Sequence, residues 1–380
     1  MRRGVSMRQV ATQFRVALST VQSWVQRAGT QRLDRVDWSD RPRGPHRPAN
    51  KCSRELEDLV LTLRRQLKET SDLGEFGAEA IQRALQDQGV ELFPAVRTIG
   101  RILERRGALD GRTRPRRPAP PRGWYLPDVA AGQAELDSFD IVEGLVIKGG
   151  TDVEVLNGIS LHGGLVASWP QAAITAESVL EALLQHWQAV GLPAYAQFDN
   201  DTRFQGPHQH PDTLGRVTRG CLSLGVVPVF APPRESGFQA AIENFNGRWQ
   251  AKVWARFQHA SLAALQGQSA KFIAASRRRA APRLDKAPAR RPFPTGWHLN
   301  LKARPHGCLI FLRRTTEQGV ASLLGHTFAL DPTWPHRLVR AEVDLDAQII
   351  RFYALRRREP TWQPLLREVP YEFPRRRFNS

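Results

Sequence analysis

The chain has 380 residues, with 55 lysines and arginines against 37 aspartates and glutamates, and a formal net charge of +18. This length allows two or three domains, and a hydrophobic content of 41% can fill their cores, which excludes a short basic peptide and a disordered tail. The sequence has no stretch typical of a membrane span or a secretory signal, and its three cysteines form no CxxC pair. We therefore expect a basic cytoplasmic protein without a membrane partner, a disulfide framework or a zinc site.

The positive charge is concentrated toward the two ends of the sequence. Residues 1–124 carry 25 basic and 14 acidic side chains, residues 125–250 carry 6 and 14, and residues 251–380 carry 24 and 9. An arginine-rich composition alone would not produce an acidic middle. Because basic segments attract polyanions, most commonly the phosphate backbone of DNA, the distribution predicts two DNA-binding arms around an acidic central domain. Such a protein would associate with the nucleoid.

Residues 1–50 are predicted to form a helix-turn-helix and a linker. Apolar residues recur at helical spacing from Val10 to Val25, and Ser19 is a candidate N-cap for the second helix. In a helix-turn-helix the second helix enters the major groove. Trp24 is expected to pack inward, and an ordinary helical hairpin is the alternative interpretation. The side chains expected to face DNA are Ser19, Thr20, Gln22, Ser23 and Gln26.

Residues 51–108 predict a second helical DNA-binding module, with helices over 55–69, 77–88 and 95–106. The last helix places Arg97, Arg101 and Arg105 at intervals of four on the face opposite its apolar residues. These arginines are candidates for DNA contact, although a solvated face on a dimerising bundle would show the same pattern. Residues 109–124 are rich in arginine and proline and predict an extended cationic linker.

Residues 125–260 predict an α/β domain with a mixed sheet. Short apolar runs over 133–142, 145–150, 153–160 and 165–170 are typical of consecutive strands, and a helix is expected over 176–189. A strand over 194–198, a helix over 212–224, a strand over 226–230 and a helix over about 236–257 follow. Residues 261–295 then predict a basic helical connector. Residues 296–373 contain short alternating strands that predict a small C-terminal β-barrel.

Carboxylates lie where the central domain is expected to build a site. Asp199 follows a strand, and Glu243 lies on the last helix, opposite its apolar stripe. The first strand offers Asp137 and Asp140, which are an odd number of residues apart. Side chains at such positions point to opposite faces of a regular strand, so only one of the two can join the site.

Three ordered motifs, SFDIVEGLVIKGG, YAQFDNDTRFQG and PPRESGFQAAIENFNGRW, resemble the core of DDE transposases and retroviral-type integrases. Within that superfamily the sequence is most similar to insertion-sequence transposases with an integrase catalytic core. The resemblance implies an RNase H-like fold whose catalytic and metal-binding residues are Asp140, Asp199 and Glu243. Asp140 matches better than Asp137 because of its distance to the turn at Gly149 and Gly150. The resemblance also implies two Mg²⁺ or Mn²⁺ ions, with the first aspartate bridging them.

The implied function is that of a DNA transposase that binds element ends and catalyses metal-dependent phosphodiester cleavage and strand transfer. The implied partners are double-stranded DNA, as element ends and target, and further copies of the chain in a synaptic homo-oligomer; no small-molecule substrate is implied. Asn246 and Arg248 are further candidates for DNA contact. The sequence departs from the pattern by a long interval between Asp199 and Glu243, and by Ala240 at a position where glycine is frequent. Two alternatives stay open, a catalytically inactive, domesticated DNA-binding regulator and a purely hydrolytic metal-dependent nuclease.

Overall fold

The computed structural model describes residues 4–39, 52–109, 122–207, 210–235, 237–357 and 359–374. The chain divides into two compact units, Met1–Leu59 and Val60–Ser380, which are described separately below. None of the helices in the described residues is long and apolar enough to cross a lipid bilayer.

The first unit contains the two helices of the predicted helix-turn-helix, α1 (Met7–Phe14) and α2 (Leu18–Ala28), followed by the 3₁₀ turn η1 (Leu33–Arg35). Ser6 caps α1 in a capping box with Gln9. Two predictions for α2 are wrong. Ala17 is its N-cap, so Ser19 lies inside the first turn. Trp24 is 41% exposed and does not pack inward, because Val21 already fills the buried position of this short helix.

The predicted second helical module is present as α3 (Arg54–Thr70), α4 (Ala78–Asp87) and α5 (Val96–Arg105). The turn that follows α3 contacts the central domain. Lys252 Nζ donates to the carbonyl of Gly74 over 2.9 Å, and Arg256 Nη1 donates to the carbonyl of Ser71 over 2.6 Å. Arg256 also reaches the carbonyls of Lys68 and Glu69, so it caps the C-terminal end of α3.

The central domain begins with the one-turn helix α6 (Pro127–Ala130) and is built on five strands in the order β3-β2-β1-β4-β5. β1 to β3 are antiparallel neighbours, whereas β4 and β5 run parallel to β1. The predicted strands over 133–142 and 145–150 form one long strand. A β-bulge between Val142 and Leu145 shifts the register there, and the pairing with β2 continues on both sides of it. The bounds are β1 Leu136–Ile147, β2 Thr151–Ser160, β3 Val166–Gln171, β4 Tyr195–Phe198 and β5 Val227–Phe230.

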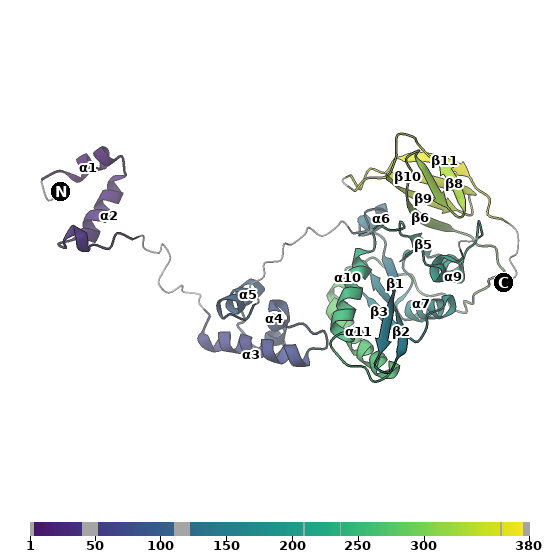
Figure 1. The fold of residues 1–380 in the computed structure, drawn as a ribbon, viewed down its shortest axis with the longest axis horizontal. Helices are drawn as coiled ribbons and strands as arrows, with labels where there is room; N and C mark the ends of the chain where they lie inside the picture. Colours follow the sequence, from purple (N-terminus) through teal and green to yellow (C-terminus); the bar gives the residue numbers. More distant parts are fainter. Residues whose placement is uncertain are drawn as a thin grey trace. The chain divides into compact units, whose positions relative to one another are not determined.

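Helices cover both faces of this sheet (Figure 1). One face packs against α7 (Ala176–Val190), the short α8 (Thr202–Gln205) and α9 (Arg216–Ser223), around Phe139 and Trp187. The helix expected over 212–224 starts only at Arg216, because Asp212 has a positive φ and Gly215 packs against the backbone of Gly206. The other face packs against α10 (Ala240–Trp249), its π-helical continuation η2 (Gln250–Trp254) and α11 (Leu262–Leu284).

The expected fold class is confirmed: helical modules precede a mixed α/β core, and further strands follow it. Those strands, however, are not a separate barrel. β6 (Cys308–Arg314) pairs in parallel with β5, and β9 (Leu338–Asp344), β10 (Ile349–Leu355) and β11 (Leu365–Pro370) continue from it as antiparallel neighbours. In the described residues the result is one nine-stranded sheet, accompanied by the hairpin β7 (Val320–Leu323) and β8 (His326–Ala329).

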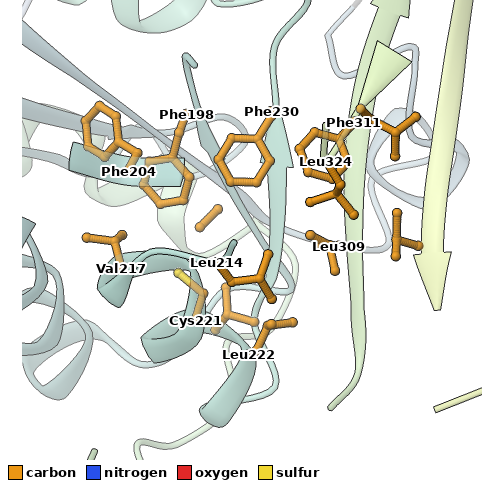
Figure 2. Close-up of a cluster of buried hydrophobic side chains, with 14 of the residues drawn as sticks. Phe198, Phe204, Leu214, Val217, Cys221, Leu222, Phe230, Leu309, Phe311 and Leu324 are labelled. Atoms are coloured by element: carbon orange, nitrogen blue, oxygen red, sulfur yellow. The ribbon is translucent and has the colours of Figure 1, made fainter. Parts of the chain in front are cut away.

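A shared core explains why the C-terminal strands join the sheet. Figure 2 shows Phe198 of β4, Phe230 of β5 and Phe311 of β6 side by side above α9. The rings of Phe230 and Phe311 are stacked, with their centroids 5.0 Å apart. Like Phe198, both side chains are fully buried. A separate barrel would expose this row of aromatic rings to water, so burial of apolar area favours one continuous sheet.

Candidate active site

The three predicted carboxylates come from three neighbouring elements of the central domain. Asp140 lies within β1, opposite Asn157 of β2, and Asp199 is the first residue after the adjacent parallel strand β4. Glu243 lies in the first turn of α10, which packs against β1 and β2. Asp140 and Asp199 are half-buried, whereas Glu243 is exposed. The fold therefore places on neighbouring elements three carboxylates that span more than 100 residues of sequence, from Asp140 to Glu243.

A buried amide chain connects α10 to the carboxylate on β1. Asn246 Nδ2 donates to Asp140 Oδ2 over 2.7 Å, and Asn157 Nδ2 donates to Asn246 Oδ1 over 2.9 Å. Asn246 is only 9% exposed as a result, so its contacts fit a role in positioning Asp140 better than the expected DNA contact. Asn157 was not identified from the sequence. The signal was a lone amide in the apolar run VEVLNGIS, where a buried polar residue requires a partner.

Burial and like charges disfavour the ionised form of Asp140. Burial and the nearby negative charges of Asp199 and Glu243 raise the pKa of Asp140 to about 6, although hydrogen bonds from the backbone of Ile141 and from Asn246 oppose the change. Burial also raises the pKa of Asp199, while a hydrogen bond from the backbone of Asp201 partly offsets this. The positive charge of Arg203 also lowers the pKa of Asp199, but burial outweighs it, so the ionised forms of both aspartates are disfavoured.

Arg203 forms its ion pairs with carboxylates other than the three predicted ones, although its charge also lowers the pKa of Asp199. Its guanidinium forms ion pairs with Asp201 at 2.6 Å, Glu143 at 2.5 Å and Glu154 at 3.4 Å. Within the described residues, no lysine or arginine forms an ion pair with any of the three predicted carboxylates. The alternative that these carboxylates serve only as structural partners of nearby arginines is therefore disfavoured.

Asp137 occupies a different environment on the opposite face of β1. It is 1% exposed, accepts a 3.0 Å hydrogen bond from Trp187 Nε1, and is held by both terminal nitrogens of Arg290 at 2.9 and 2.6 Å. Burial lowers the pKa of Arg290, but the charge and hydrogen bonds of Asp137 outweigh it, so the net shift is upward. Asp137 is a structural ion-pair residue, and Asp140 alone joins Asp199 on the other face.

The predicted DNA-contacting residues lie mostly at the surface. On α2, Ser19, Gln22, Ser23 and Gln26 are exposed and Thr20 is half-buried. Arg97, Arg101 and Arg105 are exposed along α5. Arg248 is exposed on α10, with its guanidinium 5.9 Å from the centre of the Phe245 ring. These placements leave the side chains accessible to a polyanion.

The described residues contain no group of three or more His, Cys, Asp and Glu side chains close enough to share a metal ion. The chemistry of the carboxylates nevertheless fits hydrated Mg²⁺, which prefers hard oxygen ligands, keeps several waters and requires only one or two carboxylates. The shift in the pKa of Asp140 supports this fit, because uncompensated negative charge favours a cation.

Comparison with known proteins finds a domain model that matches part of the chain. Residues 20–103 match the model of a homeodomain-like domain. No curated protein matches the chain. Among solved structures, an intasome of simian T-cell lymphotropic virus in complex with the PP2A regulatory subunit B56 gamma has 15% identity and a TM-score of 0.33, covering 71% of this chain and 87% of that one.

Two further similar structures are integrase catalytic core domains. That of BIV has 19% identity and a TM-score of 0.28, and covers 35% of this chain and 79% of its own. That of HTLV-2, in complex with magnesium, has 15% identity and a TM-score of 0.27, and covers 35% and 81%. The homeodomain-like match covers most of the helices α2 to α5, which precede the mixed sheet in the chain.

Proposed function

We propose that the chain is a metal-dependent polynucleotidyl transferase of the DDE type, which cleaves DNA at the ends of a mobile element and joins them to target DNA. The observation that carries the proposal is the position of Asp140, Asp199 and Glu243 on three adjacent elements, where none of them forms an ion pair within the described residues. The other acidic side chains near Asp199 are neutralised by Arg203. A site that keeps its negative charge at a cost in stability is typical of metal-dependent catalysis.

Asp140, Asp199 and Glu243 would hold Mg²⁺ or Mn²⁺, and we propose two ions. Bound divalent ions would supply activation of water or of a DNA 3′-hydroxyl and stabilisation of the leaving oxygen in an in-line displacement. Asn246 would fix the rotamer of the Asp140 side chain through its 2.7 Å hydrogen bond. Asn157 would fix Asn246 in turn, so both amides serve to orient the carboxylate.

The basic helical segments would bind the DNA. The exposed polar face of α2 fits the major groove, and the exposed arginines of α5 fit phosphates. We further propose that the active assembly is a homo-oligomer, because two element ends must be held together, and that it associates with the nucleoid through DNA. In this proposal the homeodomain-like region supplies recognition and the central domain supplies chemistry.

The experiment that tests the function is Mg²⁺-dependent cleavage and joining of duplex DNA that carries the sequences flanking the gene on either side. Wild type should nick the ends and join pre-nicked ends to a plasmid, whereas Asp199→Ala should bind the same DNA and do neither. Asp152→Asn is a matched control, since Asp152 is an exposed carboxylate at the start of β2. It should retain full activity.

The same experiment separates the alternatives. Hydrolysis without any joined product would indicate a nuclease. If wild type and Asp199→Ala bind DNA equally and both lack activity with Mg²⁺ and with Mn²⁺, the proposed chemistry is refuted and a DNA-binding regulator remains.

A further inference from the structure

A polar cavity lies outside the carboxylate site. It has a volume of about 190 Å³ and is bounded by the segment that follows α8 and by the β7–β8 hairpin. The backbones of Gly206 and Gly215 pack closely against each other, and a Cβ on Gly206 would lie 2.5 Å from the Gly215 nitrogen. The polar residues that line the cavity are Gln205, His210, Thr213, Arg313 and Ser322.

Arg313 is a buried cation without a counter-charge. It lies on β6 and is 9% exposed, and its Nε and Nη1 donate to the carbonyls of Ser322 and Leu312 over 3.1 and 2.9 Å. Its guanidinium is 4.9 Å from the centre of the Phe311 ring. Within the described residues no carboxylate forms an ion pair with it, and burial lowers the pKa of Arg313 to about 10. Buried guanidinium groups normally pair with an anion, because carbonyl groups alone compensate the charge poorly.

Gln205 provides an independent observation at the same cavity. Its side chain is 6% exposed, and Oε1 has no hydrogen-bond partner. Buried polar atoms rarely lack a partner unless water or a ligand supplies one. Thr213 adds a hydroxyl whose only bond in the described residues is a long 3.5 Å contact to the carbonyl of Pro211. The cavity therefore combines an unpaired cation with an amide and a hydroxyl.

We propose that this cavity binds a phosphate group, with Arg313 as the charged ligand and Gln205 and Thr213 as neutral ones. Phosphate matches guanidinium geometry and accepts hydrogen bonds from hydroxyls. Gln205 would donate from Nε2 after its amide turns about the terminal torsion, which puts Nε2 in the place of the unpaired Oε1. The volume is suitable, because a protein cavity of about 150 Å³ accommodates benzene, which has more non-hydrogen atoms than a phosphate group. A nucleotide needs more space than 190 Å³, so the occupant is either a free phosphate ion or one phosphodiester of a DNA strand that passes over the cavity.

The experiment measures binding of inorganic phosphate to the full-length protein by calorimetry and by ³¹P line broadening. EDTA is present, and chloride replaces phosphate at constant ionic strength. Without metal, the carboxylates around Asp140 repel phosphate, and the comparison of variants separates binding in the cavity from binding to the chain's other basic side chains. Wild type should bind saturably, and binding should weaken at least about tenfold in Arg313→Met. Arg337→Met, which removes an exposed arginine stacked on Trp334, should bind as wild type does.

Gln205→Leu keeps the test valid if Arg313→Met does not fold, since it changes one buried amide to an apolar side chain of similar size. A second arm titrates duplex DNA over a range of salt concentrations. If the occupant is a DNA phosphodiester, both variants should weaken DNA binding and reduce the salt slope by about one. Phosphate binding that is equal in wild type and both variants would overturn the proposal. So would the absence of phosphate binding together with unchanged DNA affinity.

The inference is independent of the proposed DNA chemistry. Asp199→Ala should abolish cleavage and leave phosphate binding unchanged. A failure of the transferase proposal would therefore not remove the phosphate site, and the reverse also holds.

Discussion

Replacing Asp137 with asparagine removes the charge from one partner of a buried ion pair. Asp137 is 1% exposed and the Arg290 side chain 9% exposed, and the two are joined by a bidentate contact at 2.9 and 2.6 Å. Trp187 Nε1 donates a further hydrogen bond to the same carboxylate. Arg290 also donates to the carbonyl of Gly191, so the pair ties the segment after α11 to the central domain.

The expected loss of stability follows from the uncompensated guanidinium. Removing one partner of a buried pair typically costs about 3–5 kcal/mol. Asparagine keeps one acceptor oxygen for Arg290 or Trp187, so we expect about 2–4 kcal/mol for Asp137→Asn. In a large domain that corresponds to a fall in Tm of roughly 4–16 °C. Replacing both partners, as in Asp137→Leu with Arg290→Met, should cost less than the sum of the single variants, since no charge is left buried.

Differential scanning calorimetry measures these values for wild type, for Asp137→Asn, for the single variants Asp137→Leu and Arg290→Met, and for the double variant that combines the last two. Cleavage activity per folded molecule provides the second readout and should be nearly unchanged in Asp137→Asn. A Tm within about 1 °C of wild type would refute the reasoning about the buried pair. Loss of cleavage in a folded Asp137→Asn protein, with activity retained in Asp140→Asn, would refute the choice of Asp140 as the first carboxylate.

Three further predictions concern the site and its sheet. Because the pKa of Asp140 is raised to about 6, the folded protein binds this proton more tightly than the unfolded chain does, and stability is lost as pH rises from about 4 through 6. Asp140→Asn should therefore abolish cleavage. In the metal-free protein it should raise the free energy of unfolding by about 1–3 kcal/mol at pH 7.5 and by almost nothing at pH 4. Thermal unfolding in EDTA measures both values, and equal effects at the two pH values would contradict the prediction. Asn246→Ala removes the hydrogen bond that lowers the pKa of Asp140, so the acidic limb of the pH–rate profile should move to higher pH and activity should fall about 10–100-fold; an unmoved profile would show that Asn246 has no such role. Gly158→Ala would place a Cβ 2.6 Å from the Phe139 ring and should cost about 1–3 kcal/mol in calorimetry, and an unchanged Tm would show that the strands can separate.

Local sequence patterns were sufficient where each element carries its own signal. The helices α3, α4, α5 and α7 match their predicted ranges within two residues, because their apolar spacing, and the cap at Thr175 for α7, are local features. The strands β4 and β5 are short apolar runs bounded by polar turns and were also predicted. In the C-terminal region the alternating runs over 307–314, 326–330, 336–345 and 349–358 predict β6, β8, β9 and β10. No run predicts β7 or β11, because β7 is only four residues long and β11 is mostly exposed at the edge of the sheet.

The sequence by itself determined the class of the fold, the asymmetry of charge and the separation of Asp137 from Asp140. The last point required only the two-residue period of a strand. It could not decide which of the two aspartates faces the helix bearing Glu243, since that depends on which face of β1 meets α7 and which meets α10.

Only the tertiary structure decided the remaining points. The C-terminal strands join the central sheet because Phe311 completes a buried row with Phe198 and Phe230, and such a match between distant segments has no local signature. For the same reason the structure alone shows that Asn246 holds Asp140, and that Arg313 is buried without a carboxylate beside a polar cavity. The burial of a side chain and its hydrogen-bond or ion-pair partners depend on contacts between distant segments. The periodicity of apolar residues reports only on the structure within a single segment.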